Sequence, residues 1–249
     1  MGVSPFLKGA KKSELKKESF YRLYKMTMAT IDVSIEANIG AGKSTLLREL
    51  KKRFPATIHI IGEPLDEWQT MIDESKGNKN ILELFYNDIP EYGFSFQMNA
   101  LKTRIEKNNQ EKVGNKINVV ERSIISDHYI FAKKLKDEGK MNLIEWKVYE
   151  EWYKWLVEAF DVMPKSMIYL RCSPEIAYER VKKRNRSEEE SITLEYLRSL
   201  HQYHEELLIG NPSLNVKIID VNEDFEENDD RIGEIFKEIF SGGETVRSD

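Results

Sequence analysis

The chain has 249 residues, of which 38 are Lys or Arg and 43 are Asp or Glu, so its formal net charge at pH 7 is −5. That length suits one large domain, and a 40% share of hydrophobic residues excludes a wholly disordered protein. The mildly acidic balance argues against general binding to nucleic acid, and no apolar run approaches the roughly 20 residues of a membrane-spanning helix. A single cysteine, Cys172, excludes an intramolecular disulfide and a cysteine-cluster metal site.

The two ends of the chain lack the apolar patterns of folded elements. Residues 1–30 are rich in lysine and serine and predict a flexible N-terminal tail. A mitochondrial presequence is the alternative, but such segments favour arginine and avoid acids, whereas this stretch has only Arg22 beside Glu14 and Glu18. We therefore expect a cytoplasmic protein. Residues 241–249 predict a second flexible tail, which leaves a single domain over residues 31–240.

Between the tails, short β-rich runs alternate with longer helical patterns. The predicted strands are apolar on both faces, as in a parallel sheet covered on both sides, and they span Ile31–Ile35, Thr57–Ile61, Ile117–Val120, Met167–Arg171 and Val216–Val221. The predicted helices span Ser44–Phe54, Leu82–Asn108 with a break near Pro90, Ser126–Lys136, Leu143–Phe160, Pro174–Lys183, Leu194–Leu208 and Asp230–Phe240. This order predicts an α/β fold with a five-stranded parallel sheet flanked by helices and ligands at the carboxyl ends of the strands.

The first predicted strand runs into a loop that nearly matches G-x-x-x-x-G-K-[ST] and opens a helix. Its N–H groups would hold phosphate oxygens, Lys43 would reach the terminal phosphates, and Ser44 would ligate Mg²⁺. The predicted triphosphate-binding residues here are Ala37, Asn38, Ile39, Gly40, Ala41, Gly42, Lys43, Ser44 and Thr45. Alanine at the first glycine position of the motif costs about 1 kcal/mol or more if the backbone there needs a positive φ. The alternative is an ordinary strand-to-helix turn.

A carboxylate follows the second predicted strand at the same edge of the sheet. Glu63 precedes Pro64, which favours an extended backbone at Glu63. A base at this place could take the proton of an attacking hydroxyl group. Taken alone, a glutamate in a surface turn is the more common case.

Several further motifs together resemble the deoxynucleoside kinase family, in that family's order and over about residues 31–240. They are Glu63-Pro64 with Trp68, Tyr86, Phe94-Ser95-Phe96-Gln97, Glu121-Arg122-Ser123 with Ser126-Asp127, and the segments 180–189 and 220–225. The nearest branch is that of the deoxycytidine and deoxyguanosine kinases. The resemblance implies a P-loop kinase fold with a lid segment and Mg²⁺ as cofactor. It also implies transfer of the γ-phosphoryl group of ATP, or another nucleoside triphosphate, to the 5′-hydroxyl of a deoxynucleoside in salvage.

The resemblance implies roles for the charged residues near the reacting groups. Glu63 would take the 5′-hydroxyl proton, Glu121 would hold Mg²⁺ with Ser44, and Arg122 would steady the transferring group beside Lys43. Two carboxylates near one reacting centre leave the identity of the base open. We prefer Glu63, because the negative charge of a carboxylate that binds Mg²⁺ is committed to the metal. The predicted lid and donor-base residues are Arg180, Arg184, Arg186, Glu223, Asp224 and Phe225.

The same resemblance implies a nucleoside pocket. Gln97, Ala100 and Arg104 fall on one helical face and would read the base with Asp127. The remaining implied pocket residues stack on the base, wall the pocket or bind the sugar 3′-hydroxyl, and they are Phe96, Trp68, Tyr86 and Glu189. By the same resemblance, the combination of Ala100, Arg104 and Asp127 implies a preference for deoxycytidine or a purine deoxynucleoside over thymidine.

Two other functions stay open at this point. A nucleoside monophosphate kinase shares the phosphate loop and lid, but it needs arginines for the acceptor's own phosphate where this chain has Glu63. A non-catalytic scaffold subunit on the same fold is the second alternative, and Ala37 is in its favour.

An apolar stripe of Trp146, Trp152, Trp155 and Phe160 on a long predicted helix indicates core packing or a dimer interface. The resemblance implies a homodimer through helices of this kind. His201 and His204 are expected to be ordinary surface or packing residues.

Overall fold

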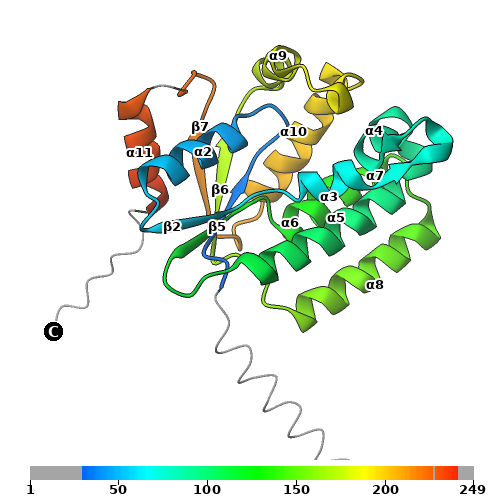
Figure 1. The fold of residues 1–249 in the computed structure, drawn as a ribbon, viewed down its shortest axis with the longest axis horizontal. Helices are drawn as coiled ribbons and strands as arrows, with labels where there is room; N and C mark the ends of the chain where they lie inside the picture. The colour runs from blue at the N-terminus through cyan, green and yellow to red at the C-terminus, as the bar shows by residue number, and fades with distance from the viewer. Residues whose placement is uncertain (1–29, 227, 241–249) are drawn as a thin grey trace, which may run out of the picture.

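The computed structural model describes residues 30–226 and 228–240 (Figure 1), so the two predicted tails lie outside it apart from Thr30. A five-stranded sheet in the order β2-β5-β1-β6-β7, with every pairing parallel, confirms the predicted α/β fold. Its strands are β1 Val33–Glu36, β2 Ile58–Ile61, β5 Ile117–Glu121, β6 Ser166–Arg171 and β7 Val216–Asp220. Each predicted strand is present with ends that differ by two residues or fewer, and their carboxyl ends share one edge.

Helices cover both faces of this sheet (Figure 1). One face carries α2 (Lys43–Arg53) and α11 (Asp229–Phe240), which contact each other. The other face carries α5 (Ile89–Glu111) and α10 (Leu194–Leu208), with α9 (Pro174–Arg184) against α10 and α8 (Leu143–Ala159) against α5.

The long helical pattern around Pro90 divides where the sequence predicts a break. A capping box at Asn80 starts α4 (Ile81–Asn87), since the Asn80 side chain accepts from Glu83 N while the Glu83 side chain accepts from Asn80 N. Asp88 then ends α4 and caps α5, with Pro90 in the first turn of α5, where its missing N–H is tolerated.

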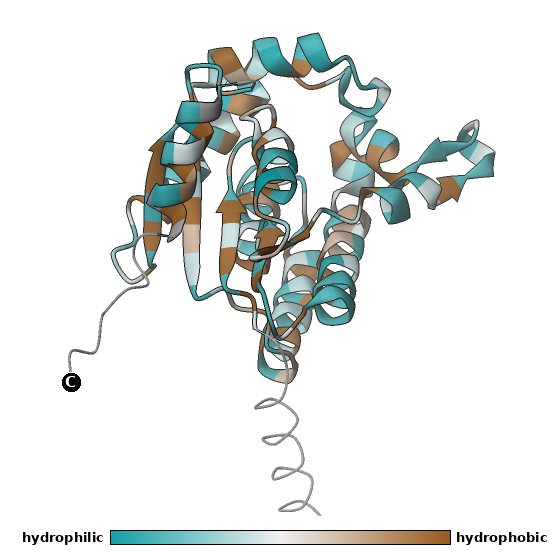
Figure 2. Ribbon diagram, turned by 60° about the vertical axis from the view of Figure 1, so that its left-hand side comes forward, coloured by the Kyte–Doolittle hydropathy of each residue, from teal (hydrophilic) through white to brown (hydrophobic). Residues whose placement is uncertain are grey.

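Several short elements were not predicted. They are α3 (Leu65–Thr70) and a two-stranded antiparallel hairpin made of β3 (Ile72–Asp73) and β4 (Lys79–Asn80), which projects from the body in Figure 2. A π-helical stretch, Asp127–Ala132, also links α6 (Ile124–Ser126) to α7 (Lys133–Asp137), so the predicted helix over 126–136 is not a regular α-helix.

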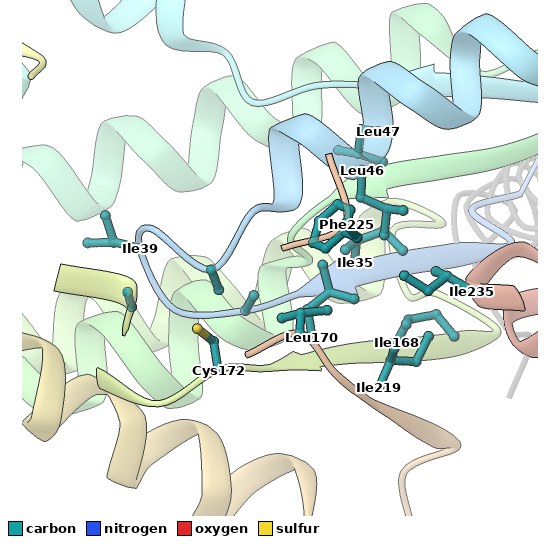
Figure 3. Packing of buried hydrophobic residues seen from close by; sticks show 14 of the residues in the cluster. Ile35, Ile39, Leu46, Leu47, Ile168, Leu170, Cys172, Ile219, Phe225 and Ile235 are labelled. Atoms are coloured by element: carbon teal, nitrogen blue, oxygen red, sulfur yellow. The ribbon is translucent and has the colours of Figure 1, made fainter. Parts of the chain in front are cut away.

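Hydrophobic residues are concentrated in the strands and the helix faces against them (Figure 2). Ile35, Leu46 and Ile168 are completely buried between β1, α2 and β6 (Figure 3). Burying each such side chain contributes about 1.5–3 kcal/mol. This packing fixes the start of α2 relative to β1, and therefore fixes the loop between them. A second apolar cluster joins α5 to α8 around Phe96 and Tyr149.

Candidate active site

A cavity of about 690 Å³ opens at the carboxyl ends of β1, β2 and β5. All ten residues predicted to contact the nucleoside line it: Glu63, Trp68, Tyr86, Phe96, Gln97, Ala100, Arg104, Arg122, Asp127 and Glu189. We call it the acceptor cavity.

A second cavity, of about 1050 Å³, lies beside the phosphate loop, and we call it the donor cavity. The predicted donor residues that line it are Gly40, Gly42, Lys43, Ser44, Thr45, Arg180, Arg184, Asp224 and Phe225. Ile39 and Arg186 line the acceptor cavity instead, and Ala37, Asn38, Ala41 and Glu223 line neither. The two cavities share Gly40, Lys43, Ser44 and Arg184, so they adjoin each other at these residues.

Two glycines shape the phosphate loop. Gly40 and Gly42 have φ values of 80° and 95°, and a Cβ on Gly40 would lie 2.2 Å from the carbonyl oxygen of Ala177 in α9. Ala37 is not among the described residues with positive φ, so the positive φ at which alanine would cost folding energy is not required at this position. Its side chain is completely buried in the core below the loop.

Lys43 is buried at the junction of the two cavities. Its ammonium donates to the carbonyl oxygens of Ala37 and Asn38, at 3.4 and 3.2 Å. Burial and the nearby Arg122 cation lower the pKa of Lys43 to about 7, although Glu121 and Glu63 act in the opposite direction. Phosphate oxygens at this junction would supply the negative charge that the buried ammonium lacks.

Glu63 lies among cations at the end of β2. Its carboxylate accepts from Arg122 and, at 3.4 Å, from Arg104, while Lys107 donates to its main-chain oxygen at 3.2 Å. Burial alone would raise the pKa of Glu63, but Arg122, Arg104 and Lys43 outweigh it and lower the pKa to about 2. The side chain is therefore ionised at neutral pH.

Glu121 and Ser44 meet across β5 and α2. The Ser44 hydroxyl donates to the Glu121 carboxylate at 2.9 Å. Mg²⁺ prefers oxygen ligands, and it is usually held by one or two carboxylates together with substrate phosphates. The pair fits that ion, and within residues 30–226 and 228–240 no cluster of three or more His, Cys, Asp or Glu side chains is arranged as a metal site. A metal here would need oxygens from the donor.

The turn after β5 has an unusual backbone. Arg122 adopts a φ of 61°, and its guanidinium pairs with Glu63 and donates to Ala37 O at 3.3 Å. Arg122 thus forms its ion pair with the residue after β2 rather than with its neighbour Glu121. Arg122 also lies over the ring of Phe131, with 4.9 Å between the guanidinium carbon and the ring centroid.

The predicted base-reading residues include a buried ion pair. Arg104 Nε donates to Asp127 at 2.6 Å, and its Nη1 donates to the main-chain oxygen of Glu121 at 2.6 Å. Burial raises the pKa of Asp127, and Arg104 only partly offsets this. Arg104 therefore contacts the turn after β5 as well as the acceptor cavity, a second role that helical spacing does not reveal.

Aromatic rings form another part of the wall of the acceptor cavity. Trp68 packs edge-on against Phe96, with centroids 5.2 Å apart, and its indole N–H donates to Thr103 at 2.9 Å. Phe85 stacks on Phe96 at 4.5 Å. Four apolar lining residues belong to no motif that predicts them: Leu65, Leu82, Phe85 and Phe131. The one signal for Phe85 is its position next to Tyr86.

The lid region begins where α9 ends, at Asn185 with a φ of 49°. Arg184 pairs with Glu189 at 2.6 Å on one carboxylate oxygen, and Arg186 lies 3.6 Å from the same side chain. Gln69 of α3 donates to Glu188 at 2.7 Å, which ties the lid to the wall that carries Trp68.

Arg180 differs from the predicted lid role. Its guanidinium donates to the main-chain oxygens of Val221, Asn222 and Glu223, at 2.9, 3.3 and 3.2 Å. Arg180 thus connects the loop after β7 to α9. The guanidinium N–H groups that were predicted to bind phosphate oxygens bind these main-chain oxygens instead. Phe225 of that loop packs under α2 with 3% of its surface exposed (Figure 3).

The two histidines of α10 have the ordinary environments expected. His204 is completely buried, and that burial lowers its pKa to about 3, while His201 lies 3.8 Å from Glu205.

Over the described part of the chain, no helix combines the length and the apolar character needed to cross a membrane.

Comparisons with known proteins agree with this geometry. A match to the deoxynucleoside kinase family covers residues 33–242, so the chain belongs to that family. The chain is a deoxynucleoside kinase, and the alternatives of a monophosphate kinase or a non-catalytic scaffold subunit are not favoured.

Individual relatives are about equally similar. A probable deoxycytidine kinase of fowlpox virus is 36% identical over 84% of this chain and 86% of its own length. Deoxycytidine kinase 2 of Gallus gallus is 34% identical over 79% of this chain and 84% of its own. The mitochondrial thymidine kinase 2 of Homo sapiens is also 34% identical, over 80% of this chain and 77% of its own. Identity alone therefore does not separate the bases.

Proposed function

We propose that this kinase phosphorylates the 5′-hydroxyl of deoxycytidine or a purine deoxynucleoside with the γ-phosphoryl group of ATP or another nucleoside triphosphate. The observation that carries the proposal is the junction of the two cavities. Lys43, Ser44 and Arg184 border both, while Glu63 and Arg122 lie on the acceptor side. An acceptor hydroxyl beside Glu63 and a terminal phosphate beside Lys43 would therefore meet at that junction.

In this scheme the chain's own residues position and stabilise the reacting groups. The Glu63 carboxylate is ionised and accepts the proton of the 5′-hydroxyl. Arg122 holds that carboxylate and presents its remaining N–H groups to the transferring phosphoryl group. Lys43 binds the donor's terminal oxygens. Phosphoryl transfer depends mainly on such positioning and charge stabilisation.

We propose that Ser44 and Glu121 hold Mg²⁺ together with the donor's phosphates. The support is the direct hydroxyl–carboxylate contact at the start of α2, which brings two hard oxygen ligands together. The ion would supply charge neutralisation on the donor phosphates.

The base preference rests on the edge formed by Gln97, Arg104 and Asp127. All three are buried and line the acceptor cavity. An Asp127 carboxylate accepts from an exocyclic amine, which cytosine, adenine and guanine carry and thymine lacks. Small Ala100 and large Arg104 on one face leave a polar rather than an apolar surface for the 5-position of a pyrimidine.

We propose a homodimer formed through α8. Ile144, Val148, Trp152 and Trp155 recur at helical spacing on its outer face, and Trp152 and Trp155 are 48% and 55% exposed. The predicted stripe is wrong in one respect, because Trp146 faces the opposite way and packs into the core around Phe96. Exposed apolar rings on one helix face are typical of a subunit contact.

We also propose a cytoplasmic enzyme that does not bind nucleic acid. The single, buried Cys172 fits a reducing compartment, and the net charge of −5 gives no general attraction to phosphate backbones. Imaging of a fluorescent fusion tests the first statement, and a salt-dependent DNA-binding titration tests the second.

The function is tested by a phosphate-transfer assay with ATP, Mg²⁺, and a panel of four deoxynucleosides and their monophosphates. We expect 5′-monophosphates from deoxycytidine or a purine deoxynucleoside, with lower kcat/KM for thymidine and no product from the monophosphates. Highest kcat/KM on thymidine would overturn the base assignment. Turnover of the monophosphates alone would overturn the acceptor assignment.

A further inference from the structure

Glu36, the last residue of β1, is a completely buried carboxylate with no part in the proposed mechanism. It lines neither the acceptor nor the donor cavity. A buried carboxylate is costly unless hydrogen bonds satisfy it, so its partners indicate what it does for the fold or the site. Both partners lie just after Arg122.

Each oxygen of Glu36 accepts one hydrogen bond from the segment that follows Arg122. Oε1 accepts from the main-chain N–H of Ser123 at 3.0 Å, and Oε2 accepts from the Ser126 hydroxyl at 2.5 Å. Ser123 is the N-cap of α6, but its own hydroxyl makes no capping bond. The Glu36 carboxylate instead accepts from the N–H of this N-cap residue, the bond that a glutamate at N3 makes in a capping box.

This contact continues the pairing between β1 and β5 beyond the end of the strands. Ile35 lies opposite Glu121 in the sheet, and Arg122 N donates to Ile35 O at 3.1 Å. At the next residue the chain turns, and a Glu36 carboxylate oxygen accepts from Ser123 N in place of a main-chain oxygen. From the other side, Arg104 donates to the main-chain oxygen of Glu121.

Arg122, between these contacts, has a left-handed backbone that a residue with a side chain seldom adopts. Such a conformation persists only when surrounding contacts over-determine it. The same backbone directs the guanidinium toward Glu63 and Ala37 O. The orientation of Arg122 therefore depends on two hydrogen bonds. Its own N–H donates to Ile35 O, and the N–H of Ser123 donates to the Glu36 carboxylate.

We propose that Glu36 is a positioning residue, which fixes the left-handed turn so that the Arg122 guanidinium points at the reacting group. The proposal rests on the proposed role of Arg122. Without Glu36, Ser123 N loses its acceptor, the turn relaxes, and the guanidinium moves away from the position it holds beside Glu63. Substrate binding through the aromatic wall and Gln97 is not affected.

The first test is steady-state kinetics of Glu36→Ala with MgATP and the best nucleoside. We expect kcat to fall about 100-fold, the effect of a displacement near 1 Å, with KM for the nucleoside within about threefold. Glu36→Gln is the conservative variant, because its amide oxygen can accept from Ser123 N and its amide nitrogen can donate to Ser126. It should restore kcat to within about tenfold of the unmodified enzyme. An equal loss in the Gln and Ala variants would overturn the proposal.

A double-mutant cycle separates positioning from general stability. If Glu36 acts through Arg122, then adding Glu36→Ala to Arg122→Ala should lower kcat by less than about threefold. Additive losses would overturn the inference alone, whereas an unchanged kcat in Arg122→Ala would overturn the proposed role of Arg122 itself. If Glu36→Ala does not fold, Glu36→Asp replaces it, since a side chain shorter by one methylene keeps the charge but cannot reach both donors.

Discussion

The carboxylate of Glu63 combines a low pKa with the position of a base. Glu63→Gln keeps its size but cannot take a proton, and it leaves Arg122 without its counter-ion. We expect nucleoside binding to be retained and kcat to fall by about 10²–10⁴-fold, the usual range for loss of general-base catalysis. Steady-state kinetics with a separate binding titration measures both, and the exposed Glu67→Gln on α3 is the matched control. Near-normal turnover in Glu63→Gln would dismiss the base role.

The lowered pKa of Lys43 predicts proton uptake when a triphosphate binds. At pH 8, a pKa of about 7 leaves most Lys43 side chains without their proton, and donor phosphates restore it, so triphosphate binding should take up protons. Calorimetry with a non-hydrolysable ATP analogue in buffers of different ionisation enthalpy measures this uptake. Lys43→Arg, which stays charged, should bind without uptake, and equal uptake in both proteins would contradict the assignment.

The same shift has a consequence for stability. The pKa of Lys43 is lower in the folded chain than its ordinary 10.5, so the unfolded state binds the extra proton between about pH 7 and 10.5. The contribution of Lys43 to the free energy of unfolding therefore rises with pH across that window.

Arg104 and Asp127 form a buried ion pair, and their removal should not be additive. Arg104→Met alone strands a buried carboxylate, which costs about 3–5 kcal/mol, whereas Arg104→Met with Asp127→Ala removes both charges and should cost less. Thermal unfolding of the two variants tests this order. If the single variant is the more stable, the pair does not behave as a buried ion pair.

Combining that double change with Ala100→Val should also move the base preference toward thymidine. The combination removes the acceptor for an exocyclic amine and makes the pocket face apolar. The kcat/KM ratio of thymidine to deoxycytidine measures the change, and an unchanged ratio would leave Gln97 as the residue that reads the base.

Most members of the acceptor cavity could be predicted because their motifs resemble those of a family. What sequence could not supply is the partner of each side chain. Arg180 binds main-chain oxygens of the loop after β7, and Thr103 holds the Trp68 indole, and neither contact leaves a pattern in spacing. The left-handed Arg122 is equally invisible, because arginine gives no hint of a positive φ.

At the scale of elements, the phosphate loop is fitted closely against α9. Gly40→Ala would put a Cβ 2.2 Å from Ala177 O and force alanine into a left-handed backbone. We expect a loss of at least about 2 kcal/mol of folding free energy, together with a higher KM for ATP. Ala37→Gly is the matched change at a position without positive φ and should leave KM for ATP unchanged, since there is no strain to relieve. Thermal unfolding and steady-state kinetics of both variants measure the folding free energy and KM for ATP. Equal changes in the Gly40→Ala and Ala37→Gly proteins would contradict this prediction.

The larger elements were predictable because their apolar patterns are long and regular. The five strands of the main sheet and the long helices α2, α5, α8, α9, α10 and α11 follow from runs of Ile and Val and from helical periodicity. The hairpin β3–β4 has two residues in each strand, and α3 has six, so neither offers enough periods to detect. The π-helical stretch at Asp127–Ala132 has no distinct composition that would predict it.

At the scale of the whole molecule, the outer face of α8 predicts a dimer. Trp155→Glu places a charge among the exposed apolar residues of that face and should yield monomers of 29.2 kDa in place of particles of twice that mass. Sedimentation velocity distinguishes the two. Ile218→Glu, at an exposed apolar position on β7, is the matched control and should keep the mass of the unmodified protein. A monomeric unmodified protein would contradict the proposed interface.

The end of α9 carries Asn185 in the left-handed region that helices usually reserve for glycine. Asparagine samples fewer backbone conformations than glycine, so the segment that carries Arg184, Arg186 and Glu189 has less disorder to lose when it becomes ordered. The side chain of Asn185 therefore removes part of the backbone freedom that a glycine at this position would leave. For the same reason, the ordering of this segment should depend less on temperature than that of a lid hinged on glycine.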